Sequence, residues 1–335
     1  MSPAPADPDA FAARVDPQVR AVLDTIPRLD LSDLPTARRE REALALLAVA
    51  GRTPPPGVET RDMGVPGRDG EPEMRLRVHT PREGTVGPVP VLLWVHGGGH
   101  VMGAAAQDDP MLQDLVERTR CVAVAVEWRR SPEFPYPAAL HDCVAAYRWL
   151  ADPGSQVLGV DPGRLVVGGA SSGGGLAAGV VLALRDAGDV RPRGQLLVYP
   201  MLDDRELTAS SREITDRRVW NHESNRLGWS AYLGALASDD VPAYAAPARA
   251  TVLAGLPPTW VATGDLDLFR DEDIAYAASL AASGVPTELH VYPGAVHGFD
   301  LFAPFADVSR RFRRERDDAF DRFLQGPRPD LAEGP

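Results

Sequence analysis

Residues 169–173 read Gly169-Ala170-Ser171-Ser172-Gly173, a G-x-S-x-G pentapeptide that follows the apolar run Leu165-Val166-Val167. The chain then continues into the apolar segment 176–182, which we expect to be helical. A strand, a sharp turn and a helix in this order can expose a serine hydroxyl, because the flanking glycines permit a strained backbone at the turn. By itself the pentapeptide is a weak signal, since glycine and serine are common in ordinary turns. Ser171 is therefore a candidate nucleophile whose partners must be found elsewhere in the chain.

A base and an acid for Ser171 occur later in the chain. A serine hydroxyl becomes nucleophilic when an imidazole accepts its proton and a carboxylate orients that imidazole. His297 follows a strand-like run and the turn Pro293-Gly294, so it lies on a loop that leaves a strand. Another apolar run, residues 259–262, leads into a loop that holds Asp265 and Asp267. Serine, acid and histidine thus follow one another in the chain order of the α/β-hydrolase fold.

A glycine-rich loop supplies the second requirement, a place for the oxyanion. His96-Gly97-Gly98-Gly99 directly follows residues 91–95, an apolar run that predicts a buried parallel strand. We expect the backbone N–H groups of Gly98, Gly99 and Ser172 to form the oxyanion hole. Each such donor typically contributes about two to three orders of magnitude in rate. Without the downstream pentapeptide, a flexible Gly-rich turn would be the better interpretation.

These motifs together resemble the hormone-sensitive-lipase-like esterases, the HGGG-type bacterial carboxylesterases of the α/β-hydrolase superfamily. The resemblance covers roughly residues 58 to 325 and extends to Val126–Ala139, Tyr199-Pro200 and His297-Gly298-Phe299. It implies an α/β fold with a mostly parallel central sheet, helices on both faces and a helical cap. It also selects Asp267 over Asp265, because the family's Asp-Pro-Leu-Arg-Asp-Glu block corresponds to residues 267–272.

The function that the resemblance implies is hydrolysis of small or medium acyl esters through an acyl-enzyme on Ser171. An acyltransferase, a lactonase or a cyclase acting on a natural product would use the same residues and stays open. A serine peptidase is disfavoured by the glycine loop and by the lack of room for a propeller domain. A non-catalytic small-molecule receptor of this fold is disfavoured because His297 is present.

Two departures from the family pattern flank the nucleophile. The family commonly has Asp or Glu before the serine and Ala after it, whereas this chain has Ala170 and Ser172. We interpret the change as tuning of activity, because Ser172 still contributes its backbone N–H. Leu268 and Phe269 replace the usual Pro and Leu, which could shift the acid loop.

The order of the predicted elements suggests a catalytic domain with a cap. Strand-like segments are predicted near residues 59–65, 74–79, 91–95, 121–126, 165–167, 195–198, 259–262 and 287–291. Helical patterns separate the later ones, as in a parallel sheet covered on both faces. Residues 1–57, with helical patterns at 9–23 and 36–49, are expected to form part of the cap. We expect 58–325 to be the catalytic domain, 203–247 a cap insertion, and 326–335 a C-terminal tail.

Composition limits the partners and the location. The net charge of −12 disfavours nucleic acid. The chain lacks a secretory signal and an apolar run long enough to span a membrane, so a cytoplasmic location is expected. Cys121 and Cys143 are expected to be reduced core residues. No metal-type spacing of His and carboxylates occurs, so no metal or cofactor is expected, and a homodimer stays open.

Overall fold

A single mixed sheet forms the centre of the molecule. The computed structural model describes residues 8–49, 51–67, 70–84, 86–236 and 238–325, so the expected tail at 326–335 lies outside the described residues. The eight strands lie in the order β1-β2-β4-β3-β5-β6-β7-β8. In chain order they are β1 (Val58–Val65), β2 (Met74–Pro81), β3 (Val89–Val95), β4 (Val122–Glu127), β5 (Val160–Ala170), β6 (Gln195–Val198), β7 (Thr259–Leu266) and β8 (Thr287–Val296).

Most of the sheet is parallel, as expected from its apolar strands. The strands β4, β3, β5, β6, β7 and β8 pair in parallel, whereas β2 runs antiparallel to both β1 and β4. Every residue from Val91 to Val95 in β3 is buried, because helices cover both faces of the sheet. The carboxyl ends of the parallel strands therefore meet at one edge, where ligands bind in folds of this kind.

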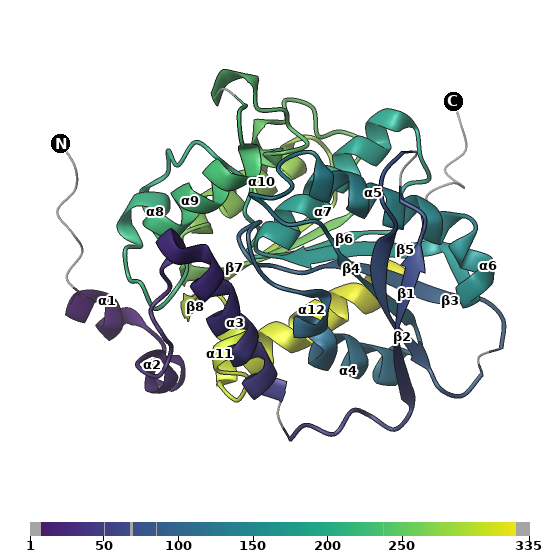
Figure 1. The fold of residues 1–335 in the computed structure, drawn as a ribbon, viewed down its shortest axis with the longest axis horizontal. Helices are drawn as coiled ribbons and strands as arrows, with labels where there is room; N and C mark the ends of the chain where they lie inside the picture. The colour runs from purple at the N-terminus through teal and green to yellow at the C-terminus, as the bar shows by residue number, and fades with distance from the viewer. Residues whose placement is uncertain (1–7, 50, 68–69, 85, 237, 326–335) are drawn as a thin grey trace.

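Two layers of helices cover the sheet (Figure 1). On one face lie α4 (Asp109–Thr119) and α12 (Asp307–Gln325), joined by the ion pair of Arg118 with Asp321 at 2.5 Å. On the other face lie α5 (Ala138–Ala151), α7 (Ser172–Ala187) and α10 (Arg270–Ala282). Shorter helical segments are η2 (Ala105–Asp108), α6 (Gly154–Leu158), η3 (Ser238–Asp240), η4 (Pro247–Arg249) and α11 (Phe299–Phe302).

The two segments expected to form a cap lie side by side outside these layers. The N-terminal segment holds α1 (Pro8–Arg14), α2 (Pro17–Leu23), η1 (Leu31–Asp33) and α3 (Leu34–Val49). The later segment holds α8 (Ala209–Glu213) and α9 (His222–Leu233), and α9 contacts η1 (Figure 1). Residues 9–23 form two helices rather than one, because Pro17 starts a new helix whose first N–H groups bond to the Asp16 carboxylate.

Two further sequence expectations can be compared with the described residues. Cys121 and Cys143 are both free thiols and fully buried, as expected. Within the described ranges, no helix combines the length and the hydrophobicity needed to cross a lipid bilayer.

Candidate active site

Ser171 occupies the sharp turn between β5 and α7. Its φ of 56° and ψ of −125° lie outside the usual regions for a residue with a side chain, and such strain is concentrated at functional sites. The strand β5 ends at Ala170 and α7 begins at Ser172, so a single residue makes the turn. The side chain of Ser171 consequently projects at the carboxyl edge of the sheet.

Ser171, His297 and Asp267 form one hydrogen-bonded chain. The Ser171 hydroxyl lies 3.0 Å from Nε2 of His297, and Nδ1 of His297 lies 2.8 Å from Oδ2 of Asp267. A buried carboxylate beside Nδ1 favours the tautomer with its proton on Nδ1, which leaves Nε2 free to accept the serine proton. The other oxygen of Asp267 accepts the N–H of Phe269 at 2.9 Å, so both oxygens of this fully buried acid have partners. The edge of Phe269 also faces the His297 ring, with centroids 5.2 Å apart.

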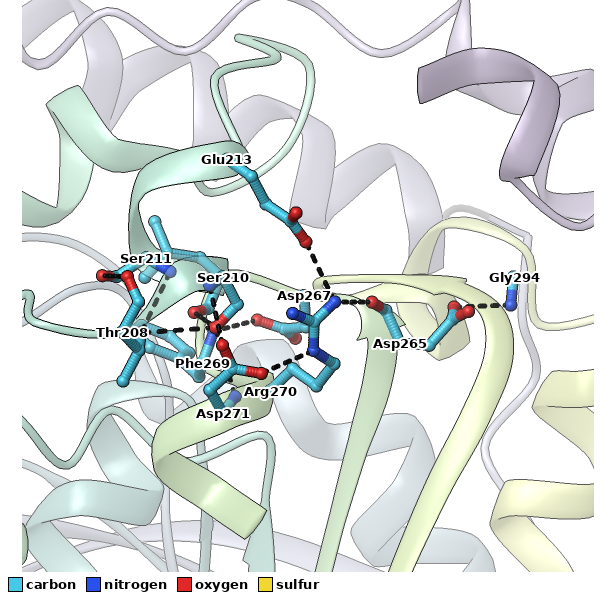
Figure 2. A network of polar contacts seen from close by, with 11 residues as sticks. Thr208, Ser210, Ser211, Glu213, Asp265, Asp267, Phe269, Arg270, Asp271 and Gly294 are labelled. Atoms are coloured by element: carbon cyan, nitrogen blue, oxygen red, sulfur yellow. Dashed lines mark hydrogen bonds and ion pairs between the residues drawn. The ribbon is translucent and has the colours of Figure 1, made fainter. Parts of the chain in front are cut away.

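Asp265 has a different environment from Asp267. Its Oδ1 accepts the N–H of Gly294 at 2.7 Å, and Figure 2 places it facing Gly294, away from Asp267. Asp265 thereby ties the end of β7 to the β8 segment that leads to His297. Of the two candidate acids, the structure brings Asp267 to His297.

The acid loop is also tied to the cap segment (Figure 2). Oγ of Ser210, on α8, donates to the Leu268 carbonyl at 2.8 Å and accepts the N–H of Asp271 at 3.1 Å. The Arg270 guanidinium bridges Glu213, also on α8, to the Asp265 carbonyl, at 2.9 and 2.8 Å. The unusual Leu268 and its neighbours are therefore fixed from both sides.

The glycine loop lies directly against the nucleophile. A β-carbon placed on Gly97 would lie 3.2 Å from Cβ of Ser171. Gly98 and Gly99 have φ values of 138° and 58°, in the region that favours glycine. Ser172 is the first residue of α7, and the N–H of such a residue has no partner within its own helix. The glycine loop and the start of α7 therefore both adjoin Ser171, and the role of the Gly98, Gly99 and Ser172 amides in an oxyanion hole stays a prediction.

Two histidines flank these glycines, and neither reaches the serine. Nδ1 of His96 lies 2.8 Å from the Gly97 carbonyl, and its ring stacks on Trp128 at 4.7 Å. His100 is buried and stacks on Tyr232, with ring centroids 3.8 Å apart. Burial lowers the pKa of His96 to about 4 and that of His100 to about 3, so both rings are neutral near pH 7. His96 is thus placed to orient the glycine loop.

The residues beside the nucleophile are buried. Ala170 is 8% exposed, and Ser172 is fully buried with no hydrogen-bond partner for its hydroxyl among the described residues. A carboxylate at position 170 would therefore be largely removed from water. The structure gives no further role to the Ser172 side chain.

Arg129 and Glu133 have separate ion-pair partners. Arg129 pairs with Asp142 at 2.8 Å and with Glu71 at 2.6 Å. Glu133 receives two hydrogen bonds from Arg38 of α3, at 2.7 and 2.8 Å. Arg38 also donates to the Val101 carbonyl at 2.7 Å, so it joins the N-terminal segment to the end of the glycine loop.

Two aromatic side chains at the site were not assigned roles from the sequence. The ring edge of Tyr199 faces His297, with centroids 4.6 Å apart. The indole of Trp220 lies on Gly99, where a β-carbon would clash with it. Tyr199 belongs to the Tyr199-Pro200 motif, and Trp220 lies in the expected cap insertion, residues 203–247. Neither stretch of sequence indicates that its aromatic ring would face the site.

A small apolar cavity opens beside the glycine loop. Its volume is about 250 Å³, and its walls include Leu31 and Leu34, Val101, and Leu227 and Ala231. These residues come from the N-terminal segment, the end of the glycine loop and α9. Among the described residues, no three His, Cys, Asp or Glu side chains are grouped to hold a metal ion.

Comparison with known proteins identifies similar chains. Residues 92–301 match the family described as the alpha/beta hydrolase fold. The chain is 35% identical to esterase LipI of Mycobacterium tuberculosis over 290 residues, covering 86% of this chain and 89% of LipI. It is 32% identical to carboxylesterase NlhH of the same organism, covering 89% and 92% of the two chains.

A solved structure agrees with the fold. The structure named bacterial heroin esterase superimposes with a TM-score of 0.90 at 42% sequence identity. The superposition covers 94% of this chain and 99% of that one.

Proposed function

This chain belongs to the hormone-sensitive-lipase-like family of alpha/beta hydrolases, and from that premise we propose that it is a carboxylesterase acting through Ser171, His297 and Asp267. The observation that carries the proposal is the continuous chain of contacts from serine to acid, with distances of 3.0 and 2.8 Å. Proton transfer by a positioned histidine needs contacts of this length.

Acylation begins when Oγ of Ser171 attacks the ester carbonyl carbon and its proton passes to Nε2 of His297. The carbonyl oxygen becomes an oxyanion, which the N–H groups of Gly98, Gly99 and Ser172 stabilise. The negative Asp267 stabilises the imidazolium. When the tetrahedral intermediate collapses, the bond to the leaving oxygen breaks and His297 returns the proton to the departing alcohol.

Deacylation follows the same path in reverse with water as the nucleophile. Water gives its proton to His297 and its oxygen bonds to the acyl carbon, forming a second oxyanion in the same hole. Collapse releases the carboxylic acid and returns the proton to Ser171. No electrons are gained or lost, so this reaction needs only the ester and water.

Small or medium acyl esters are the proposed substrates, and residues 1–57 and 203–247 the proposed cap. Both segments contribute to the apolar cavity beside the glycine loop. Its volume of about 250 Å³ lies below the roughly 300 to 1,000 Å³ usual for ligand pockets. We propose that this cavity receives the acyl group, in which case its size favours short acyl groups over long chains.

The test uses a series of p-nitrophenyl esters from acetyl to long acyl chains, with wild type and Ser171→Ala. We expect wild type to hydrolyse the shorter esters best and to react with a fluorophosphonate, and Ser171→Ala to do neither. Ser279→Ala, which alters an exposed serine on α10, is the matched control and should retain both properties. Full activity in Ser171→Ala would exclude this nucleophile, and a wild type inert to every ester and to the fluorophosphonate would exclude the esterase.

A second measurement distinguishes hydrolysis from acyl transfer. Adding an alcohol acceptor should leave the acid as the main product if water is the physiological nucleophile. A product mixture dominated by the transferred ester would instead favour the acyltransferase alternative.

A further inference from the structure

The ring of Tyr199 faces His297, and its hydroxyl bonds to the helix that follows His297. The centroids of the two rings lie 4.6 Å apart at an interplanar angle of 62°, an edge-to-face arrangement. The Tyr199 hydroxyl donates to Oδ1 of Asp300 at 2.8 Å. Asp300 is in the first turn of α11, three residues after His297. One tyrosine therefore contacts the imidazole and anchors the backbone that carries it.

The backbone of Tyr199 is held in an unusual conformation. Its φ of 35° is positive, which is uncommon for a residue with a side chain and is retained where the surroundings enforce it. The N–H of Tyr199 donates to the Ala262 carbonyl of β7 at 2.6 Å. Two residues later, the N–H of Met201 donates to the Ser171 carbonyl at 3.0 Å. The turn after β6 is thus fixed to the nucleophile and to β7, and it directs the ring toward His297.

The chain turns sharply directly after His297. Gly298 has a φ of 74°, and α11 (Phe299–Phe302) is a single turn. Removal from water raises the pKa of Asp300, while the Tyr199 hydroxyl and the nearby Arg316 oppose that rise. The Tyr199 hydroxyl is thus one of the groups that favour the charged form of Asp300.

We propose that Tyr199 and Asp300 form a positioning pair that holds the His297 ring in line between Asp267 and Ser171. The inference rests on the proposed function, because it assigns the pair a role only if His297 is the base. The rings of Tyr199 and Phe269 both contact the His297 ring in edge-to-face arrangements. Asp300 fixes the loop so that the ring returns to the same orientation after each proton transfer.

The test removes either the donor or the acceptor of the pair. Tyr199→Phe keeps the ring against His297 and deletes only the hydroxyl, and Asp300→Ala deletes the acceptor. Because small misplacements of catalytic groups cost one to two orders of magnitude, we expect kcat to fall about tenfold in each variant. KM should change by less than about twofold, since neither side chain lines the cavity proposed to receive the acyl group. The kcat of the double variant should equal that of the less active single variant, because both substitutions break the same hydrogen bond.

Asp300→Asn tests whether the interaction itself matters. Its amide oxygen can still accept the tyrosine proton, so we expect this variant to retain most of the wild-type kcat. The second-order rate of fluorophosphonate labelling should follow the same ranking, because that reaction needs the same base.

The chain offers a matched control in Tyr292. Its hydroxyl donates to Glu315 at 2.5 Å, and its ring contacts Phe299. Tyr292→Phe therefore deletes a similar tyrosine-to-carboxylate bond. It should lower the melting temperature about as much as Tyr199→Phe while leaving kcat close to wild type.

The outcomes separate this inference from the proposed function. If wild type is active and depends on Ser171, but Tyr199→Phe and Asp300→Ala keep the wild-type kcat, the positioning pair is refuted and the esterase stands. Equal losses of kcat in Tyr199→Phe and Tyr292→Phe would also refute it, since general loosening would then explain both. If Ser171→Ala remains fully active, the proposed function itself fails.

Discussion

The indole of Trp220 lies directly against the backbone of Gly99, so the cap segment at residues 203–247 contacts the glycine loop. Nε1 of Trp220 donates to Oδ1 of Asn225 at 3.1 Å, and the Asn225 amide donates to Glu206 at 2.8 Å. These two bonds fix the orientation of the ring. The position of an amide proposed to bind the oxyanion therefore depends on a side chain 121 residues away (220 − 99).

Gly99→Ala should lower kcat by about two orders of magnitude, the usual effect of losing one oxyanion donor. The added methyl group would clash with Trp220, and the φ of 58° is unfavourable for alanine. Steady-state kinetics on p-nitrophenyl acetate would measure the loss. The double variant Gly99→Ala/Trp220→Ala should regain part of it, and an unchanged kcat in Gly99→Ala would argue against a role for this amide.

Asp267→Asn should lose about four orders of magnitude in kcat, because an amide no longer favours the required histidine tautomer. Asp265→Asn should stay near wild type, since its amide oxygen can still accept the Gly294 N–H. The two purified variants would be compared on the same ester. Comparable losses in both would contradict the assignment of Asp267.

Glu133→Gln should destabilise the protein in a pH-dependent way. Hydrogen bonds from Arg38 lower the pKa of Glu133 to about 2, from an ordinary value of 4.5. A lowered folded-state pKa stabilises the protein above the ordinary value, and this contribution is lost as the pH falls from 4.5 toward 2. Since Glu133 is half exposed, the melting temperature should differ by only about 1–2 °C at pH 7. The difference should shrink in melts at pH 3.5, and a constant difference would contradict the ion pair.

Ser210→Ala should weaken the link between the cap segment and the acid loop. It leaves the Leu268 carbonyl and the Asp271 N–H without their Ser210 partner. Loss of such buried bonds typically costs about 1–3 kcal/mol. Denaturant unfolding would measure the cost against Ser279→Ala, which alters a bond within one exposed helix turn. Equal stabilities of the two variants would rule out the link.

The central part of the fold was predictable because uninterrupted apolar runs mark buried parallel strands. The strand β6 (Gln195–Val198) matches its predicted range, and the other strands contain theirs apart from Cys121, which precedes β4. The extensions of β5 back to Val160 and of β7 to Leu266 include polar residues such as Asp161 and Asp265. The ends of these extensions, Val160 and Leu266, pair with Val89 and Val296 across irregular stretches of the sheet, which hydrophobic patterns do not report.

At the site, the sequence identifies those residues whose role only a few amino-acid types can fill. A nucleophile, a base and an acid at strand ends can be recognised by type and order, and the structure brings Ser171, His297 and Asp267 together. Their catalytic roles stay predictions until the variants are measured. The contacts of Tyr199 and Ser210 could not be predicted, because they arise when turns far apart in the chain pack on one another.

The separation of 126 residues between Ser171 and His297 has a consequence for synthesis. At the usual rate of translation, about ten seconds pass between the two residues leaving the ribosome. A nascent chain at that stage carries the serine and its glycine loop but no base. Fluorophosphonate should therefore label only chains in which the segment with His297 has folded against Ser171. The labelled fraction of newly synthesised chains would then measure how many have folded completely.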